Sequence, residues 1–243
     1  MKDNRPTKQN IISTAFKTIL KKIGWYSMFF QSEDKYDTEL AFQKMWSEEF
    51  RVNKHIVREY WEKYRYLNEI LSTVGFTDST KVLDVGCGIS TVLHYIPGQK
   101  HGIDPLADKY QKLYAYPEDV QIQKAWGEDE VFTNEYFDVI FCTNALDHVT
   151  DPRKTIDNIQ RMLKNDGFFI LTLELFTEVI ERDAAHPHCL TKSRVMQLLG
   201  DRFKAVLEKE SPWIGLRRYV IGERSHKHNE LILILQKNKP SGT

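Results

Sequence analysis

Short apolar runs alternate with amphipathic segments from residue 81 to the end of the chain. The runs are rich in Val, Ile, Leu and Phe and predict buried β-strands, and the segments between them have helical spacing. The predicted strands are 81–85, 99–103, 119–124, 137–143, 167–174, 203–210 and 230–236. The predicted helices are 90–96, 106–114, 152–164 and a segment from about 191. This alternation predicts an α/β fold, with a mostly parallel sheet and helices on both faces.

Capping residues mark several of these boundaries. Asp151 and Pro152 suit the N-cap and the first position of the helix 152–164. Gly167 lies just beyond the expected end of that helix, where glycine favours termination. Ser90 is the expected N-cap of the helix 90–96.

Residues 1–76 are interpreted as a helical extension ahead of one globular unit, residues 77–243. Residues 11–30 combine helical apolar spacing with lysines and an aromatic end, so this segment packs either on the domain or on a membrane surface. Residues 38–74 predict one or two further helices. Between residues 56 and 71 the apolar positions recur at i, i+3, i+4 and i+7, which indicates one buried face.

The composition is that of an ordinary globular protein. The 243 residues are 41% hydrophobic and 28% charged, which is enough for one sizeable core. The 34 basic and 34 acidic residues cancel, which disfavours nucleic acid as a partner. The three cysteines form no C-x-x-C pair, so neither a disulfide framework nor a structural zinc is expected. No metal is included in the expected site. No apolar leader or long apolar run is visible, and we expect a cytoplasmic protein without stable membrane insertion.

A ligand-binding turn is predicted at the end of the first strand, in Asp84-Val85-Gly86-Cys87-Gly88. Glycines let a ligand approach the backbone closely and allow φ above zero. Asp104 closes the second strand about 20 residues later, the offset at which a carboxylate meets ribose hydroxyls in such folds. A dinucleotide fingerprint would need glycine at position 91, where this chain has Thr91. The pattern therefore indicates a nucleoside-bearing cofactor other than a dinucleotide.

This turn resembles motif I of the class I S-adenosylmethionine (SAM) methyltransferases, and Asp104 matches their ribose-binding acid. Later segments resemble the same family in the same order, most closely its methyltransferase type 11 subgroup. They are Gly127-Glu128-Asp129, Phe137-Asp138-Val139-Ile140-Phe141, Leu146-Asp147-His148-Val149-x-Asp151-Pro152 and Arg161-Met162-Leu163-Lys164-Asn165-Asp166-Gly167. The resemblance implies a Rossmann-like sheet of seven strands, with the last one, Leu231–Leu235, inserted antiparallel beside the fifth. It implies a SAM-dependent methyltransferase that releases S-adenosyl-L-homocysteine.

The resemblance also implies which residues hold the cofactor. The glycine turn would lie beneath the methionine and ribose, Asp104 would accept from the ribose hydroxyls, and the loop at Trp126 would meet adenine. Trp126 stands where relatives often have a small polar residue. The expected cofactor contacts are Asp84, Gly86, Cys87, Gly88, Asp104, Pro105, Trp126, Gly127, Glu128 and Asn144.

The acceptor side follows the fourth strand, at the sheet edge where such folds bind ligands. Relatives that methylate amines often carry [N/D]-P-P-[Y/F] there, whereas this chain has Asn144-Ala145-Leu146-Asp147. The difference favours oxygen over nitrogen as the methylated atom, on a small molecule, glycan or peptide. His148 is the candidate general base because imidazole titrates near neutral pH, and the alternative is that it only orients its loop.

Six further side chains are candidates for acceptor binding, each with a plainer alternative. They are Tyr60, Trp61, His186, His188, Arg217 and Arg218. The two aromatic residues equally suit packing of a helix on the core. The two histidines, together with Asp183, could instead hold a metal. The two arginines could clamp an anionic acceptor or belong to a solvated basic loop, residues 213–228.

Two other functions remain open from the sequence. A non-catalytic partner subunit that binds SAM would keep the same cofactor residues. An NAD-dependent oxidoreductase is disfavoured by Thr91.

Overall fold

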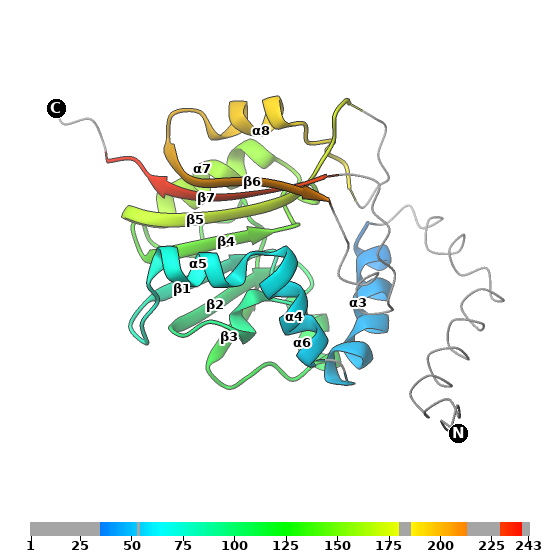
Figure 1. The fold of residues 1–243 in the computed structure, drawn as a ribbon. Coiled ribbons are helices and arrows are strands. Elements are labelled where there is room, and N and C mark those ends of the chain that lie inside the picture. Colours follow the sequence, from blue (N-terminus) through cyan, green and yellow to red (C-terminus); the bar gives the residue numbers. More distant parts are fainter. Residues whose placement is uncertain (1–34, 53, 180–185, 213–228, 240–243) are drawn as a thin grey trace, which may run out of the picture.

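In the computed structural model, which describes residues 35–52, 54–179, 186–212 and 229–239, the strands form one sheet (Figure 1). Its order over the described residues is β3-β2-β1-β4-β5-β7-β6. The strands are β1 (Lys81–Val85), β2 (Gln99–Asp104), β3 (Val120–Lys124), β4 (Phe137–Thr143), β5 (Leu163–Leu175), β6 (Phe203–Pro212) and β7 (Asn229–Lys237). Strands β1 to β5 pair in parallel, and β7 is antiparallel to both β5 and β6. The predicted α/β architecture with an antiparallel last strand is confirmed.

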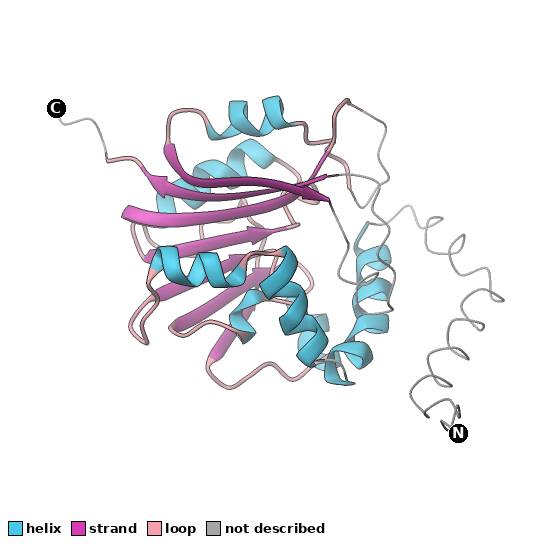
Figure 2. Cartoon of the chain, viewed as in Figure 1, coloured by secondary structure: helices cyan, strands magenta, loops and turns pink. Residues whose placement is uncertain are grey.

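Helices cover both faces of the sheet (Figure 2). They are α3 (Lys35–Val52), α4 (Lys54–Tyr64), α5 (Leu67–Val74), the 3₁₀ turn η2 (Val92–His94), α6 (Ala107–Leu113), α7 (Pro152–Met162) and α8 (Lys192–Leu199). Buried side chains of α4, α5, η2 and α6 pack in one core cluster, and those of α7 and α8 pack in the other. Figure 1 shows α3 across the end of the sheet where the parallel strands terminate.

Successive residues of the central strands fill these two cores in turn, because side chains of a strand alternate between faces. In β4, Val139 and Phe141 belong to the core under α4 and α5, whereas Ile140 and Cys142 belong to the core under α7 and α8. A strand that is buried on both faces must be apolar at every position. This is why the sequence shows continuous apolar runs here and no alternation.

A buried ion pair joins the helical layer to the sheet. Arg65, after α4, pairs with Glu230 at the start of β7, and the two side chains are 5% and 1% exposed. The guanidinium carbon also lies 5.3 Å from the centre of the Tyr60 ring. Removing either partner would be strongly destabilising, because the remaining buried charge would keep its full desolvation free energy without a compensating ion pair. The pair therefore fixes where the chain between α4 and α5 meets the sheet.

Three details of the predicted helices are wrong. The apolar spacing from residue 56 to residue 71 spans two helices, since Tyr66 adopts a left-handed φ of 52° between α4 and α5. The spacing continues across the break because both helices bury side chains in the same core cluster.

The predicted helix 90–96 is only the 3₁₀ turn η2, and its cap is Thr91 and not Ser90. The hydroxyl oxygen of Thr91 accepts the N–H of Leu93 at 3.1 Å. Pro97 disfavours a helical conformation at the preceding residue, and Gly98, with a φ of 124°, then leads into β2 at Gln99.

The third error concerns the end of α7. That helix begins as predicted, with Asp151 as N-cap and Pro152 in its first turn, but it ends at Met162. Strand β5 starts at once with Leu163, and its pairing with β4 shifts before Phe168. The residue with a left-handed backbone between α7 and the paired part of β5 is Asp166, whose φ is 62°. Gly167 therefore does not terminate the helix, which has already ended at Met162.

The segment 11–30 lies outside the described residues, and its interpretation as a lid or a membrane-surface helix stays a prediction. Within the described ranges, no helix is both long and apolar enough to cross a membrane. The boundary between an extension and a globular unit near residue 76 also stays a prediction.

Candidate functional site

The turn after β1 crosses the end of β2 in a conformation that depends on glycine. Gly86 and Gly88 have φ values of 70° and 51°, as the sequence suggested. The N–H groups of Gly86 and Cys87 donate to the carbonyl of Ile103 at 2.9 and 3.2 Å. A Cβ on Gly86 would collide with the Cβ of Ala145, which follows β4. Glycine at this position is therefore required by packing as well as by the backbone conformation.

Asp104 ends β2 beside this turn and is 8% exposed. One carboxylate oxygen accepts the N–H of Leu106 at 2.8 Å, and the other accepts the N–H of Gly88 at 3.2 Å. Burial raises the pKa of this carboxyl to about 6, although the two N–H groups act in the opposite direction. Each carboxylate oxygen has two acceptor sites, so capacity remains for two ribose hydroxyls.

Asp84 is the second buried acid, and it is 2% exposed. Its Oδ2 accepts the Thr91 hydroxyl at 2.6 Å, while its Oδ1 has no hydrogen-bond partner among the described residues. Burial raises the pKa of Asp84 to about 7. A buried acceptor without a donor is costly, and a ligand that brings an N–H or a positive charge would remove that cost.

Helix α3 lies over the glycine turn and supplies residues that the sequence did not reveal. The Gln43 side-chain oxygen accepts the N–H of Ile89 at 3.3 Å, and its nitrogen donates to Glu39 at 2.8 Å. That nitrogen lies 3.2 Å from where a Cβ of Gly88 would be. The sequence predicted a helix in this region, but it gave no signal for Gln43, because one polar residue in a helix far upstream has no pattern.

A cavity of about 420 Å³ adjoins Asp104 on the side where adenine is expected. Pro105 and Leu106 follow Asp104 on one wall, and Tyr36 of α3 and Trp126 lie on another. The indole N–H of Trp126 donates to the Tyr36 hydroxyl at 2.7 Å. The remaining lining residues are Asp37, Asp108, Lys109, Lys112 and Lys124. An indole beside this cavity could stack on a planar ring.

Gly127 and Glu128 hold the Trp126 loop against the start of α7. The Glu128 Oε1 accepts the N–H groups of Thr150 and Asp151 at 2.8 and 2.9 Å. The Gly127 carbonyl accepts the side-chain amide of Asn158 at 2.8 Å. The Glu128 Oε2 has no hydrogen-bond partner among the described residues. Direct contact of these two residues with adenine stays a prediction.

Cys87 offers only its backbone to the turn. Its side chain is buried, and the sulfur lies 2.9 Å from where a Cβ of Gly102 would be, towards β2. Burial and the nearby Asp104 and Asp84 raise the pKa of the thiol well above its ordinary value. The thiol is therefore neutral and faces the sheet.

The acceptor side begins at the end of β4. Asn144 has a left-handed φ of 55°, and its N–H donates to the Thr172 carbonyl at 2.8 Å. Its side-chain oxygen is buried without a hydrogen-bond partner in the part of the chain that the structure describes. His148 is 28% exposed, and its ring centre lies 4.2 Å from that of His186. The structure thus brings Asn144, His148 and His186 to the carboxyl edge of the sheet.

The other candidates for acceptor binding do not join them. Tyr60 and Trp61 are 1% and 4% exposed and pack in the core under α4, which is the plainer alternative for both. The His188 ring bonds to the Val149 carbonyl at 2.9 Å. Arg217 and Arg218 lie outside the described residues, as does Asp183.

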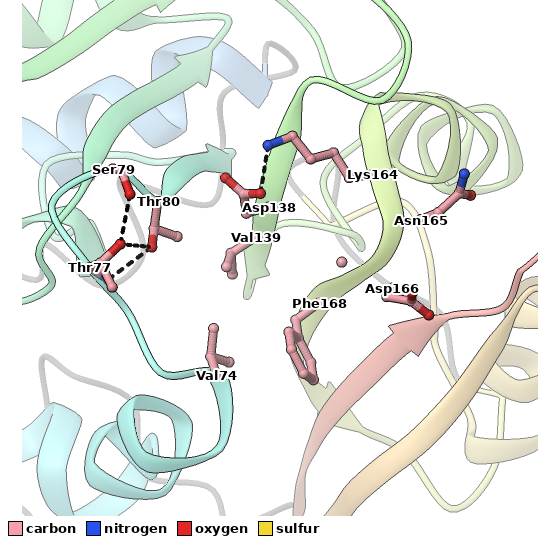
Figure 3. A pocket seen from close by; sticks show the side chains of 11 residues that line it. Val74, Thr77, Ser79, Thr80, Asp138, Val139, Lys164, Asn165, Asp166 and Phe168 are labelled. Carbon is pink, nitrogen blue, oxygen red and sulfur yellow. Dashed lines mark hydrogen bonds and ion pairs between the residues drawn. The ribbon is translucent and has the colours of Figure 1, made fainter.

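A second cavity, of about 400 Å³, lies at the opposite edge of the sheet (Figure 3). It is formed by residues before β1 and at the starts of β4 and β5, and Lys164 reaches Asp138 across it at 2.6 Å. The ligands of open α/β sheets bind at the carboxyl ends of strands. This cavity is therefore not the candidate site.

The central part of the chain matches a known family. Residues 83–171 match the family model described as a methyltransferase domain. A ubiquinone biosynthesis O-methyltransferase from Shewanella sp. (strain ANA-3) is 34% identical over 110 residues, which are 42% of this chain and 47% of that protein. The chain spans about half the length of the curated relatives it matches.

Solved structures share the fold at low sequence identity. A SAM-dependent methyltransferase from Methanosarcina mazei has a TM-score of 0.55 and 16% identity, over 70% of this chain and 98% of that one. The [4+2]-cyclase SpnF has a TM-score of 0.55 and 18% identity, over 72% of this chain and 81% of that one. Identities this low show a common fold alone.

The contact between Gly86 and Ala145 is testable without a ligand. Gly86→Ala should lower the free energy of unfolding by about 2 to 5 kcal/mol, since it combines overpacking with a left-handed alanine. Adding Ala145→Gly should recover the overpacking part and leave the backbone part. Denaturant unfolding of the wild type and the two variants measures both parts. A Gly86→Ala variant as stable as the wild type, or one that Ala145→Gly fails to improve, contradicts the geometry.

Proposed function

We propose that this chain, which contains a class I methyltransferase domain of the type 11 subgroup, is an enzyme. The proposed reaction transfers a methyl group from SAM to an oxygen atom. The proposed acceptor is a hydroxyl or carboxylate of a small molecule, glycan or peptide. The observation that carries the cofactor assignment is the glycine turn that presents the Gly88 N–H to Asp104. The relative described as an O-methyltransferase supports the choice of oxygen.

The described residues fit a sulfonium nucleoside. Asp104 would accept from both ribose hydroxyls, and Trp126 and Pro105 would enclose adenine in the adjoining cavity. The Oδ1 of Asp84, which lacks a hydrogen-bond partner among the described residues, suits the positive end of the same molecule. Gln43 and Glu39 of α3 are added to this set as residues that close over the turn.

SAM, when bound, supplies an electrophilic methyl group, so that a C–O bond forms as the C–S bond breaks and a hydroxyl acceptor gives up one proton. The protein's contribution is to orient the acceptor oxygen and to exclude water. Asn144 offers a buried side-chain oxygen to a hydroxyl at the end of β4. His148, on the loop that follows, is the proposed recipient of the proton. Helix α3 would keep water from this loop, and Lys35 at its start donates to the His148 carbonyl at 3.3 Å.

We assign this covering role to α3, the first described helix of the extension, residues 1–76. Two other functions compete with methyl transfer. The likeness to SpnF, which is described as a cyclase, means that the fold alone does not specify the reaction. A partner subunit that binds SAM without turnover would share every cofactor contact.

The function is tested by turnover. The full chain should form S-adenosylhomocysteine from SAM with at least one member of a panel of hydroxyl and carboxylate acceptors, and amines should be poorer. His148→Ala should lower the rate strongly while SAM affinity, measured by calorimetry, stays unchanged. Tight SAM binding with no product across the panel favours a partner subunit, and failure to bind SAM removes the proposal.

The ribose role of Asp104 predicts a loss of affinity. Asp104→Ala should weaken SAM binding by about 1.5 to 3 kcal/mol, the worth of a hydrogen bond to a charged group. Asp78→Ala, an exposed acid before β1, is the matched control and should bind SAM normally. Titration calorimetry measures both, and thermal melts confirm folding. Equal affinities of the two variants would contradict the ribose contact.

The buried acids also predict a pH dependence. Their folded pKa values, about 7 for Asp84 and about 6 for Asp104, lie above the unfolded values. Their contribution to the stability of the ligand-free protein is therefore present below pH 4 and is lost as the pH rises through 6 and 7. SAM needs both groups ionised, so its affinity should rise over the same window, by at most about tenfold per pH unit for each group.

The shift in thermal midpoint caused by SAM measures this coupling between pH 5 and pH 7. The shift should grow with pH in the wild type and grow less in Asp84→Asn, which cannot ionise. A shift that is constant or that falls with rising pH contradicts the assignment.

A further inference from the structure

We infer that Asp147, His148 and His186 form a binding site for one divalent first-row transition metal ion. One ligand atom from each side chain lies within 4.8 Å of the other two. The Asp147 carboxylate lies 3.8 Å from the His148 Nε2, and the two imidazole rings are 4.2 Å apart between centres. Two histidines and a carboxylate so close together are a recurring ligand set of catalytic metal sites.

The set differs from the one that the sequence suggested. Asp183, His186 and His188 were the candidates there, and no metal was expected. In the structure the His188 ring bonds to the Val149 carbonyl at 2.9 Å, and the His188 N–H donates to the Asp147 carbonyl at 3.3 Å. These two bonds hold the chain before α8 against the loop after β4. His188 therefore brings His186 to its neighbours and is not a ligand itself.

The loop that carries the other two ligands is also fixed. The His148 N–H donates to the Ala145 carbonyl at 3.0 Å, which closes the turn after β4. The Glu128 carboxylate accepts two N–H groups slightly further along the loop, those of Thr150 and Asp151. Asp147 is 6% exposed, so its carboxylate is held in place by packing. Such support around the ligands is what orders a metal site before the ion arrives.

The donor set selects the class of metal. Calcium and magnesium prefer oxygen ligands alone, whereas imidazole suits zinc, iron, cobalt and related ions. Three protein ligands leave at least one coordination position for an external oxygen. His148 and His186 are partly exposed, so such an oxygen can approach from solvent.

The role of the ion rests on the proposed function. A metal ion at the carboxyl edge would bind the acceptor oxygen and lower its pKa, so that the hydroxyl loses its proton to water before the methyl group arrives. With the ion bound, water takes the proton and His148 serves as a ligand; without the ion, His148 takes the proton, as proposed above. The acceptor would therefore carry a hydroxyl or enol oxygen that can bind a divalent cation.

The site is tested by metal binding without SAM or acceptor. Cobalt(II) added to the full chain should give a saturable visible absorption band with one ion per chain, and zinc(II) should compete for it. Asp147→Asn and His186→Gln should each weaken cobalt binding by at least about tenfold, as expected for lost ligands. His55→Gln, an exposed histidine on α4, is the control and should bind cobalt as the wild type does.

The metal site would be overturned if cobalt did not bind saturably to the full chain. It would also be overturned if Asp147→Asn and His186→Gln both bound cobalt with unchanged affinity. Thermal melts without metal check folding, and His148→Gln replaces either variant that fails to fold. Because cobalt binding needs no turnover, the metal site can stand if methyl transfer fails, and methyl transfer can stand without the metal. A chain that binds SAM but no cobalt contradicts only the metal.

Discussion

The hydrogen bond from the Gly88 N–H to the Asp104 carboxylate joins the turn after β1 to the end of β2, and the site is arranged around it. It forms only because Gly86 and Gly88 adopt positive φ values, which turn the backbone N–H groups towards β2. The same turn is packed against Ala145 after β4. Three adjacent strand ends are thereby held together where parallel strands present their ligands.

The remainder of the fold supports this edge from both sides. Helix α7 starts beside it, and the Glu128 carboxylate and the Asn158 amide tie the Trp126 loop to that helix. Helix α3 closes the edge from above through Gln43. Two buried acids with raised pKa values lie beneath this cover, Asp84 and Asp104. Buried acids of this kind are typical of sites that bind positive or hydrogen-bond-donating ligands.

The sequence predicted the centre of the sheet well because β1, β4, β5 and β7 are largely buried on both faces, which leaves continuous apolar runs. It predicted the turn and Asp104 because two glycines after a strand, followed at fixed spacing by an acid, are typical of a nucleoside-binding turn. It could not predict that Tyr66 breaks the helix between α4 and α5, since both helices keep the same apolar spacing. It also could not pair His186 with His148, because the contact depends on how the chain before α8 folds back onto Asp147. Contacts between distant segments leave no local pattern, and Gln43 and Tyr36 were missed for the same reason.

The most direct measurement is a crystal structure of the full chain with S-adenosylhomocysteine. The account predicts ribose hydroxyls within hydrogen-bond distance of Asp104 and adenine in the cavity between Pro105 and Trp126, under α3. It would be contradicted by density for the nucleoside elsewhere, for instance in the cavity near Asp138 and Lys164 at the opposite edge.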